Sequence, residues 1–173
     1  MRILLLTVFM LFTGVAHAST PTHIKGKYVP EAAEVGATRL KYLFWDVYDI
    51  SLHAPEGEFR FSGPFALDIH YLLDLKGKDI AKVARKEIKR QGINETHILD
   101  SWHQQLEGIF PDVKKGDRIT GFYGQDGYAY FYKNGEFIGS IQDPEFAVAF
   151  FKIWLGEETS QPQMRRALLG ADS

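Results

Sequence analysis

Arg39 is the residue whose type and position point most directly to chemistry, because it lies within an otherwise apolar stretch. A guanidinium group that faces the interior can hold a carboxylate through two parallel hydrogen bonds. Tyr48 follows beside Ile50 and Leu52, and a buried tyrosine needs a partner for its hydroxyl, which the polar end of a ligand can supply. Two alternatives stay open: a solvated strand arginine beside Lys41, and a tyrosine bonded to a backbone carbonyl or water.

The other residue types that carry chemistry do not form a familiar pattern. His97 and His103 are six residues apart, which places them on different faces of a helix. His53 and His70 could meet Asp68 across neighbouring strands, but metal sites usually show their ligand spacing in the sequence. The chain has no cysteine, no nucleophile elbow and no phosphate-binding loop. We therefore expect no metal, no cofactor and no catalytic residue that can be assigned.

A basic face is predicted on the helix that follows residue 79. Its members are Lys82, Arg85, Lys86, Lys89 and Arg90. The simplest interpretation is a solvated helix face. Contact with anionic lipid head groups is the alternative, which the modest length and apolarity of this helix do not favour.

The first eighteen residues have the pattern of a secretory signal peptide. Arg2 precedes an apolar run at 3–12, and Ala16 and Ala18 form a small-residue cleavage site, so we expect cleavage after Ala18 and a periplasmic or secreted protein. An uncleaved anchor is the alternative. No later stretch reaches the roughly 18 apolar residues of a membrane span. With Arg2 removed, 19 basic residues face 22 acidic ones, which argues against nucleic-acid binding.

Hydrophobic periodicity divides the remaining chain into an arm at 19–35 and one domain at 36–173. Asn134-Gly135 between alternating apolar residues predicts a hairpin turn. Asp143 followed by Pro144 predicts a helix start, and Ser160 with Gln163 predicts a capping box. Strands are predicted within 36–45, 47–54, 65–71, 118–123, 128–132 and 136–141, and helices within 76–92, 95–109, 143–156 and 160–169. Helices grouped between blocks of antiparallel strands indicate an α+β fold.

Two blocks of sequence together resemble the chalcone isomerase-like family. The first is Gly-Ala-Thr-Arg at 36–39 followed by Val-Tyr-Asp-Ile-Ser-Leu at 47–52. The second is the hairpin at 134–141, the apolar helix that ends in Leu-Gly at 155–156, and Ser-Gln-Pro at 160–162. The segment 110–118, with its Lys-Gly-Asp, is similar to the secreted bacterial branch. The resemblance implies an open-faced β-sandwich, in which helices cover one face of an antiparallel sheet and leave a ligand cleft between.

The resemblance also implies a ligand site. Fatty-acid-binding members of the family hold the carboxylate with an arginine and a tyrosine, which suggests Arg39 with Tyr48 or Tyr71 in this chain. The apolar tail would then lie against aromatic side chains. The candidates are Phe44, Phe150 and Trp154.

The catalytic residues of the family's plant isomerases are mostly not matched. An ungapped comparison places Leu40 rather than Arg39 at the arginine position, and the strand threonine falls on Tyr48. Three further positions hold residues of other kinds. The helix tyrosine falls on Asp79 or Ile80, the asparagine on Lys86 or Glu87, and the C-terminal hydroxyl residue on Ile153 or Trp154.

Three hypotheses follow. The leading one is a secreted, non-catalytic protein that binds an apolar or fatty-acid-like small molecule in the cleft. The second is an isomerase acting on an enone or phenolic substrate. The third is an envelope interaction module whose own aromatic side chains fill the space between sheet and helices.

Overall fold

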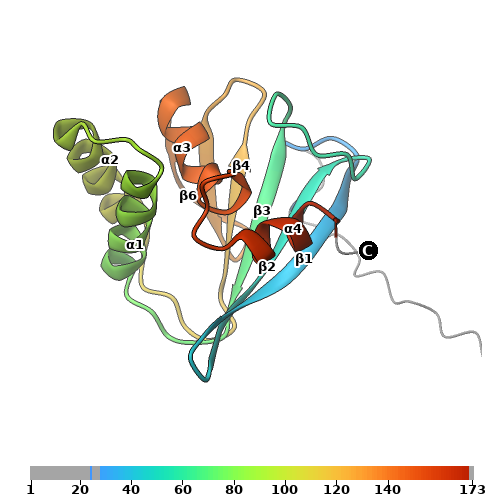
Figure 1. The fold of residues 1–173 in the computed structure, drawn as a ribbon, viewed down its shortest axis with the longest axis horizontal. Helices are drawn as coiled ribbons and strands as arrows, with labels where there is room; N and C mark the ends of the chain where they lie inside the picture. The colour runs from blue at the N-terminus through green and yellow to red at the C-terminus, as the bar shows by residue number, and fades with distance from the viewer. Residues whose placement is uncertain (1–23, 25–27, 172–173) are drawn as a thin grey trace, which may run out of the picture.

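Six antiparallel strands form a single sheet in the computed structural model, which describes residue 24 and residues 28–171. The predicted signal peptide and residues 19–23 and 25–27 of the arm lie outside the described residues. Neighbours in the sequence are neighbours in the sheet, in the order β1 to β6 (Figure 1). The strands are β1 (Ala32–Tyr42), β2 (Trp45–Pro55), β3 (Phe65–Tyr71), β4 (Arg118–Tyr123), β5 (Ala129–Lys133) and β6 (Glu136–Ile141).

Four helices gather over one face of this sheet (Figure 1). A pair of antiparallel helices connects β3 to β4, and a second pair follows β6. The helices are α1 (Gly77–Arg90), α2 (Thr96–Ile109), α3 (Pro144–Leu155) and α4 (Pro162–Leu168). This arrangement confirms the predicted α+β class and the open sheet with helices on one side.

The strict alternation of β3 explains why one face of the sheet is apolar. Phe65, Leu67, Ile69 and Tyr71 are all buried and belong to the main core beneath the helices. Successive side chains of a strand point to opposite faces, so the residues between them point away from the helices. The register extends this apolar row across the sheet, because Ile69 pairs with a core isoleucine on each side: Ile50 of β2 and Ile119 of β4.

The opposite face of the sheet is covered only in part. Ile24 and Val29 pack there against Ala66 and Phe122 in a smaller cluster. Asp68 is also buried on this face, where it accepts a hydrogen bond from the Thr120 hydroxyl at 2.7 Å. Within the part of the chain that the structure describes, no group of three or more acidic or histidine side chains could hold a metal ion.

The start of α3 is fixed as the sequence predicts. The Asp143 carboxylate accepts hydrogen bonds from the backbone N–H groups of Glu145 at 2.9 Å and Phe146 at 3.2 Å. Its second oxygen accepts one from the Trp102 indole N–H at 2.8 Å. The cap therefore joins α3 to α2 as well as satisfying the first turn. The Asn134-Gly135 turn is also confirmed, with φ angles of 51° and 84°.

Other boundaries differ from the prediction for local reasons. The predicted capping box at α4 is wrong: the Thr159 hydroxyl, not Ser160, accepts from the Gln161 N–H at 3.1 Å while donating to the Ile153 carbonyl at 2.7 Å. β1 begins at Ala32, within the segment predicted as an arm, because it pairs with the end of β2. The end of α4 covers the start of β1 so closely that a Cβ on Gly36 would lie 2.2 Å from the Ala167 carbonyl oxygen.

A glycine at the start of α1 predicts a measurable effect on stability. A Cβ on Gly77 would lie 2.0 Å from the Phe110 carbonyl oxygen, where backbone must move to make room. We expect Gly77→Ala to lower the free energy of unfolding by roughly 1–3 kcal/mol. Gly108→Ala is the control, since nothing lies within 4 Å of its Cβ position in α2, and it should be neutral or stabilising by up to about 1 kcal/mol. Urea unfolding measures both, and equal effects would contradict the close approach.

Candidate functional site

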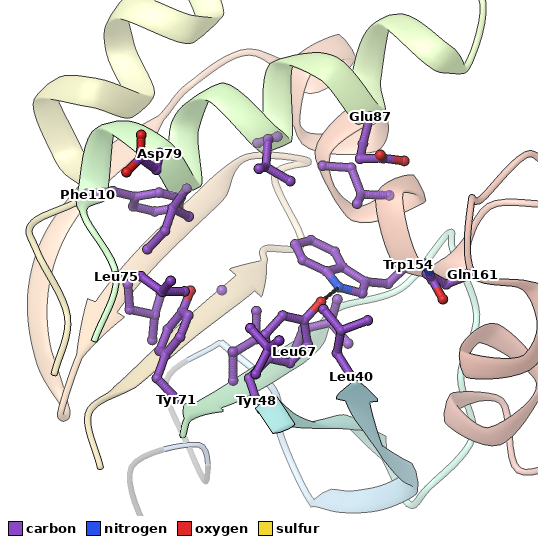
Figure 2. Close-up of a pocket in the computed structure, with 18 of the residues that line it drawn as sticks. Leu40, Tyr48, Leu67, Tyr71, Leu75, Asp79, Glu87, Phe110, Trp154 and Gln161 are labelled. Atoms are coloured by element: carbon purple, nitrogen blue, oxygen red, sulfur yellow. Dashed lines mark hydrogen bonds between the residues drawn. The ribbon is translucent and has the colours of Figure 1, made fainter. Parts of the chain in front are cut away.

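A cavity of about 480 Å³ lies between the helix-covered face of the sheet and helices α1 and α3 (Figure 2). This volume falls within the usual range for small-molecule sites. Its floor is the apolar row of the sheet, with Leu67, Ile69 and Ile119. Its walls are Ile80, Val83 and Ala84 of α1 and Phe150, Phe151 and Trp154 of α3. We call this cavity the cleft.

Two tyrosines place hydroxyl groups in the cleft, and Figure 2 shows them on the adjacent strands β2 and β3. The Tyr48 hydroxyl accepts a hydrogen bond from the Trp154 indole N–H at 3.0 Å, which leaves its own proton available to a ligand. Tyr71 is 4% exposed, and among the described residues its hydroxyl has no hydrogen-bond partner. The rings meet edge to face at 6.1 Å, so both hydroxyls are held in place by packing.

Both hydroxyls remain protonated at neutral pH. Burial, with a smaller contribution from the nearby Glu87 carboxylate, raises the pKa of Tyr48 to about 12 against the opposing effect of the hydrogen bond from Trp154. Burial also raises the pKa of Tyr71 above its ordinary value, with a smaller contribution from Tyr48. The two tyrosines therefore offer hydrogen-bond donors that carry no negative charge themselves.

The charged side chains that line the cleft are both acidic. Asp79 and Glu87 of α1 line it, and no lysine, arginine or histidine does so among the described residues. A carboxylate brought into this space would lose its hydration without gaining a cationic partner. The lining is thus suited to an apolar molecule whose polar end accepts hydrogen bonds and carries no negative charge.

The structure does not bring Arg39 into the cleft, so the expectation that it anchors a ligand there is corrected. Arg39 bonds to Asp49 at 2.5 Å and to Asp46 at 2.8 Å on the sheet face that points away from the helices. The reason is the register of the hairpin. Arg39 lies opposite Asp49, whereas Leu40 lies opposite Tyr48 and points into the cleft. The ungapped comparison, which placed Leu40 at the family's arginine position, agrees with this geometry.

Phe44 also lies away from the predicted site. The chain reverses at Leu43 and Phe44, between the paired residues Tyr42 and Trp45, so the strand alternation stops before Phe44. Its side chain is fully exposed at the tip of the hairpin.

The other four predicted residues do come together. Tyr48, Tyr71, Phe150 and Trp154 line the same cleft from β2, β3 and α3. Their contact with a ligand remains a prediction. Sequence reasoning missed the wall that α1 contributes to the cleft. The helical spacing of Ile80, Val83 and Ala84 indicated an apolar helix face that could have been assigned to it.

A second hollow of about 970 Å³ lies beside α2, α3 and the segment before α4. Its lining is rich in charged side chains, including Glu95, Lys152, Glu157, Glu158 and Arg165. Such a surface is readily hydrated, so we do not assign an apolar ligand to it.

Comparison with known proteins identifies related sequences and folds. A sequence profile described as chalcone isomerase-like matches residues 33–170. No curated protein sequence matches significantly. Among solved structures, the crystal structure of an Arabidopsis thaliana fatty-acid binding protein superposes with a TM-score of 0.64. The match covers 89% of this chain and 96% of that one at 12% sequence identity.

The raised pKa of Tyr48 predicts how stability depends on alkaline pH. In the unfolded chain this hydroxyl ionises at about pH 10, whereas in the folded protein it keeps its proton to about pH 12. Stability is therefore fully present below about pH 10 and falls as the pH rises toward 12. Tyr48→Phe should reduce this fall by about 1–2 kcal/mol in urea unfolding, compared with the parent chain. A pH dependence equal to that of the parent chain would contradict the burial of the Tyr48 hydroxyl.

Proposed function

Because the chain belongs to the chalcone isomerase-like family, we propose that it is a non-catalytic binding protein that holds an apolar or fatty-acid-like small molecule in the cleft. The observation that carries this proposal is the lining itself. An apolar cavity of about 480 Å³ with a few convergent polar groups is the usual form of a small-molecule site. The likeness to a fatty-acid binding protein supports the shared fold.

The end of the ligand that meets Tyr48 and Tyr71 is proposed to be uncharged. A hydroxyl, ester or ketone oxygen can accept hydrogen bonds from both tyrosines. A fatty acid would fit in its protonated form, because Asp79 and Glu87 oppose an additional negative charge. The ligand class is therefore an elongated apolar molecule with one neutral acceptor group.

The isomerase hypothesis has weaker support. Catalysis on an enone needs donors placed to stabilise the developing oxyanion. Two positions at which the family's isomerases carry hydroxyl groups fall here on Asp79 or Ile80 and on Ile153 or Trp154, all of which line the cleft. The aromatic-filled module has weaker support too, since the cavity leaves room for a ligand. We expect no turnover of a chalcone, which spectrophotometry would detect.

Ligand binding can be tested with a long-chain fatty alcohol and the fatty acid of equal length. We expect the alcohol to bind more tightly at neutral pH, and the acid to gain affinity as the pH falls and its carboxyl group becomes protonated. Isothermal titration calorimetry measures both. Tighter binding of the ionised acid would contradict the proposed neutral end.

Two variants locate the binding in the cleft. Tyr71→Phe should weaken binding of the alcohol by roughly 3–10-fold, because one hydrogen bond is lost. Leu67→Trp should abolish binding by filling the floor of the cavity. Tyr130→Phe is the matched control, since Tyr130 bonds to the exposed Asp126 away from the cleft. Equal effects of Tyr71→Phe and Tyr130→Phe would overturn the assignment.

Export to the periplasm or the medium is proposed from the sequence pattern at 1–18. Mass spectrometry of protein expressed in a bacterium with an outer membrane should find an N-terminus at Ser19 in the periplasmic or secreted fraction. Ala18→Arg should block this cleavage, because the cleavage site requires a small residue. A chain that keeps Met1 and stays in the cytoplasm would contradict the proposal.

A further inference from the structure

Exposed apolar side chains collect at the mouth of the cleft. The described part of the chain has six large apolar residues with strongly exposed side chains, and five of them are Tyr42, Leu43, Phe44, Trp45 and Val83. Tyr42, Trp45 and Val83 line the cleft at its opening, and Leu43 and Phe44 form the turn between the first two. The exposed fractions range from 58% for Val83 to 100% for Phe44. We call these five residues the apolar rim.

The turn at Leu43 and Phe44 combines an unfavourable backbone conformation with exposed apolar side chains. Leu43 has a φ of 54°, in the left-handed region that is unfavourable for a residue with a branched side chain. Hairpin turns normally place glycine, asparagine or aspartate at such positions. Asn134-Gly135, in the β5–β6 hairpin of the same sheet, follows that rule. An exposed leucine held in this conformation therefore indicates a selected role for the side chain rather than for the turn.

A row of cations lies on α1, the helix that contributes Val83 to the rim. Lys78, Lys82, Lys86 and Lys89 are exposed and recur at helical spacing along one side of the helix. In the part of the chain that the structure describes, none of the four forms an ion pair, whereas Arg85 pairs with Asp100. The acidic residues of α1, Asp79 and Glu87, lie on the side that lines the cleft.

From these features we propose that the apolar rim docks on a bilayer that contains anionic lipids, with the turn at Leu43 and Phe44 inserted among the head groups and the α1 lysines contacting lipid phosphates. Aromatic residues and leucine beside lysines are typical of segments that lie in the membrane interface. Each lysine near an anionic surface strengthens the attraction. No helix of the described residues is both long enough and apolar enough to span a membrane.

A protein partner fits these features less well. A stable protein interface takes about 20–30 residues from each side, far more than one turn and one valine. Pairing with a second copy would bring two rows of lysines together. Docking at the mouth of the cleft would also let an apolar ligand pass between the bilayer and the cleft without entering water. This use of the docking surface rests on the proposed function.

Trp45 provides a direct reporter of docking. It is 64% exposed, whereas Trp102 is 4% exposed and Trp154 lies in the cleft. Adding vesicles of phosphatidylcholine and phosphatidylglycerol to the full chain should shift the tryptophan emission to shorter wavelength, and Trp45→Phe should remove the shift. Vesicles of phosphatidylcholine alone should give a weaker response. No shift with anionic vesicles would overturn the proposal.

Matched variants separate the rim from other contacts in a vesicle flotation assay. Leu43→Asn with Phe44→Ser should weaken binding by roughly tenfold or more, while the melting temperature stays equal or rises because the strain at 43 is relieved. Lys82→Glu with Lys86→Glu should remove the preference for anionic vesicles. Phe137→Ser changes the sixth exposed apolar residue, on β6, and should bind like the parent chain. Every variant has the same N-terminal residues, so differences report on the substituted site.

Failure of this proposal is distinguishable from failure of the proposed function. Binding of the fatty alcohol in solution without vesicle binding would overturn the docking surface alone. Vesicle binding without alcohol binding would overturn the ligand proposal alone. Sedimentation velocity could instead detect a dimer that disappears when Leu43 and Phe44 are changed. That result would assign the rim to self-association and overturn membrane docking.

Discussion

The antiparallel register of the sheet is the constraint on which the rest of the molecule depends. Each residue of β1 to β4 faces either the helices or the opposite side, and a shift of one position would exchange the two sets. The pairing of Leu40 with Tyr48 and of Arg39 with Asp49 therefore decides the chemistry of the cleft. It gives the cleft a neutral donor and directs the guanidinium group to a carboxylate on the far side.

Most of the sheet and all four helices could be predicted from the sequence, because alternation and helical spacing are local properties. The position of Arg39 could not, since its face depends on a hairpin turn that contains Leu43 and Phe44 instead of the usual glycine or asparagine. The α1 wall of the cleft depends on contacts between segments far apart in the chain. One of them is the close approach of Gly77 to Phe110, which no local pattern reveals.

Membership of the family and the character of the cleft are separate conclusions. The fold shared with a fatty-acid binding protein at 12% identity describes the scaffold, and function lies in the side chains that the scaffold positions. In this chain the scaffold presents Tyr48 and Tyr71 beside Asp79 and Glu87. The residues that face inward, rather than the shared architecture, therefore decide which polar groups the cleft can accept.

The contact of α4 with Gly36 joins two segments that lie far apart in the sequence. α4 covers the start of β1, with the Ala167 carbonyl against the glycine. Because side chains point out of the plane of a sheet, this contact covers a face of β1 rather than its outer edge. Met164 and Leu168 of α4 belong to the main core. A chain cut before Pro162 would therefore leave part of this apolar face uncovered, and exposed apolar surface of that kind promotes association between chains.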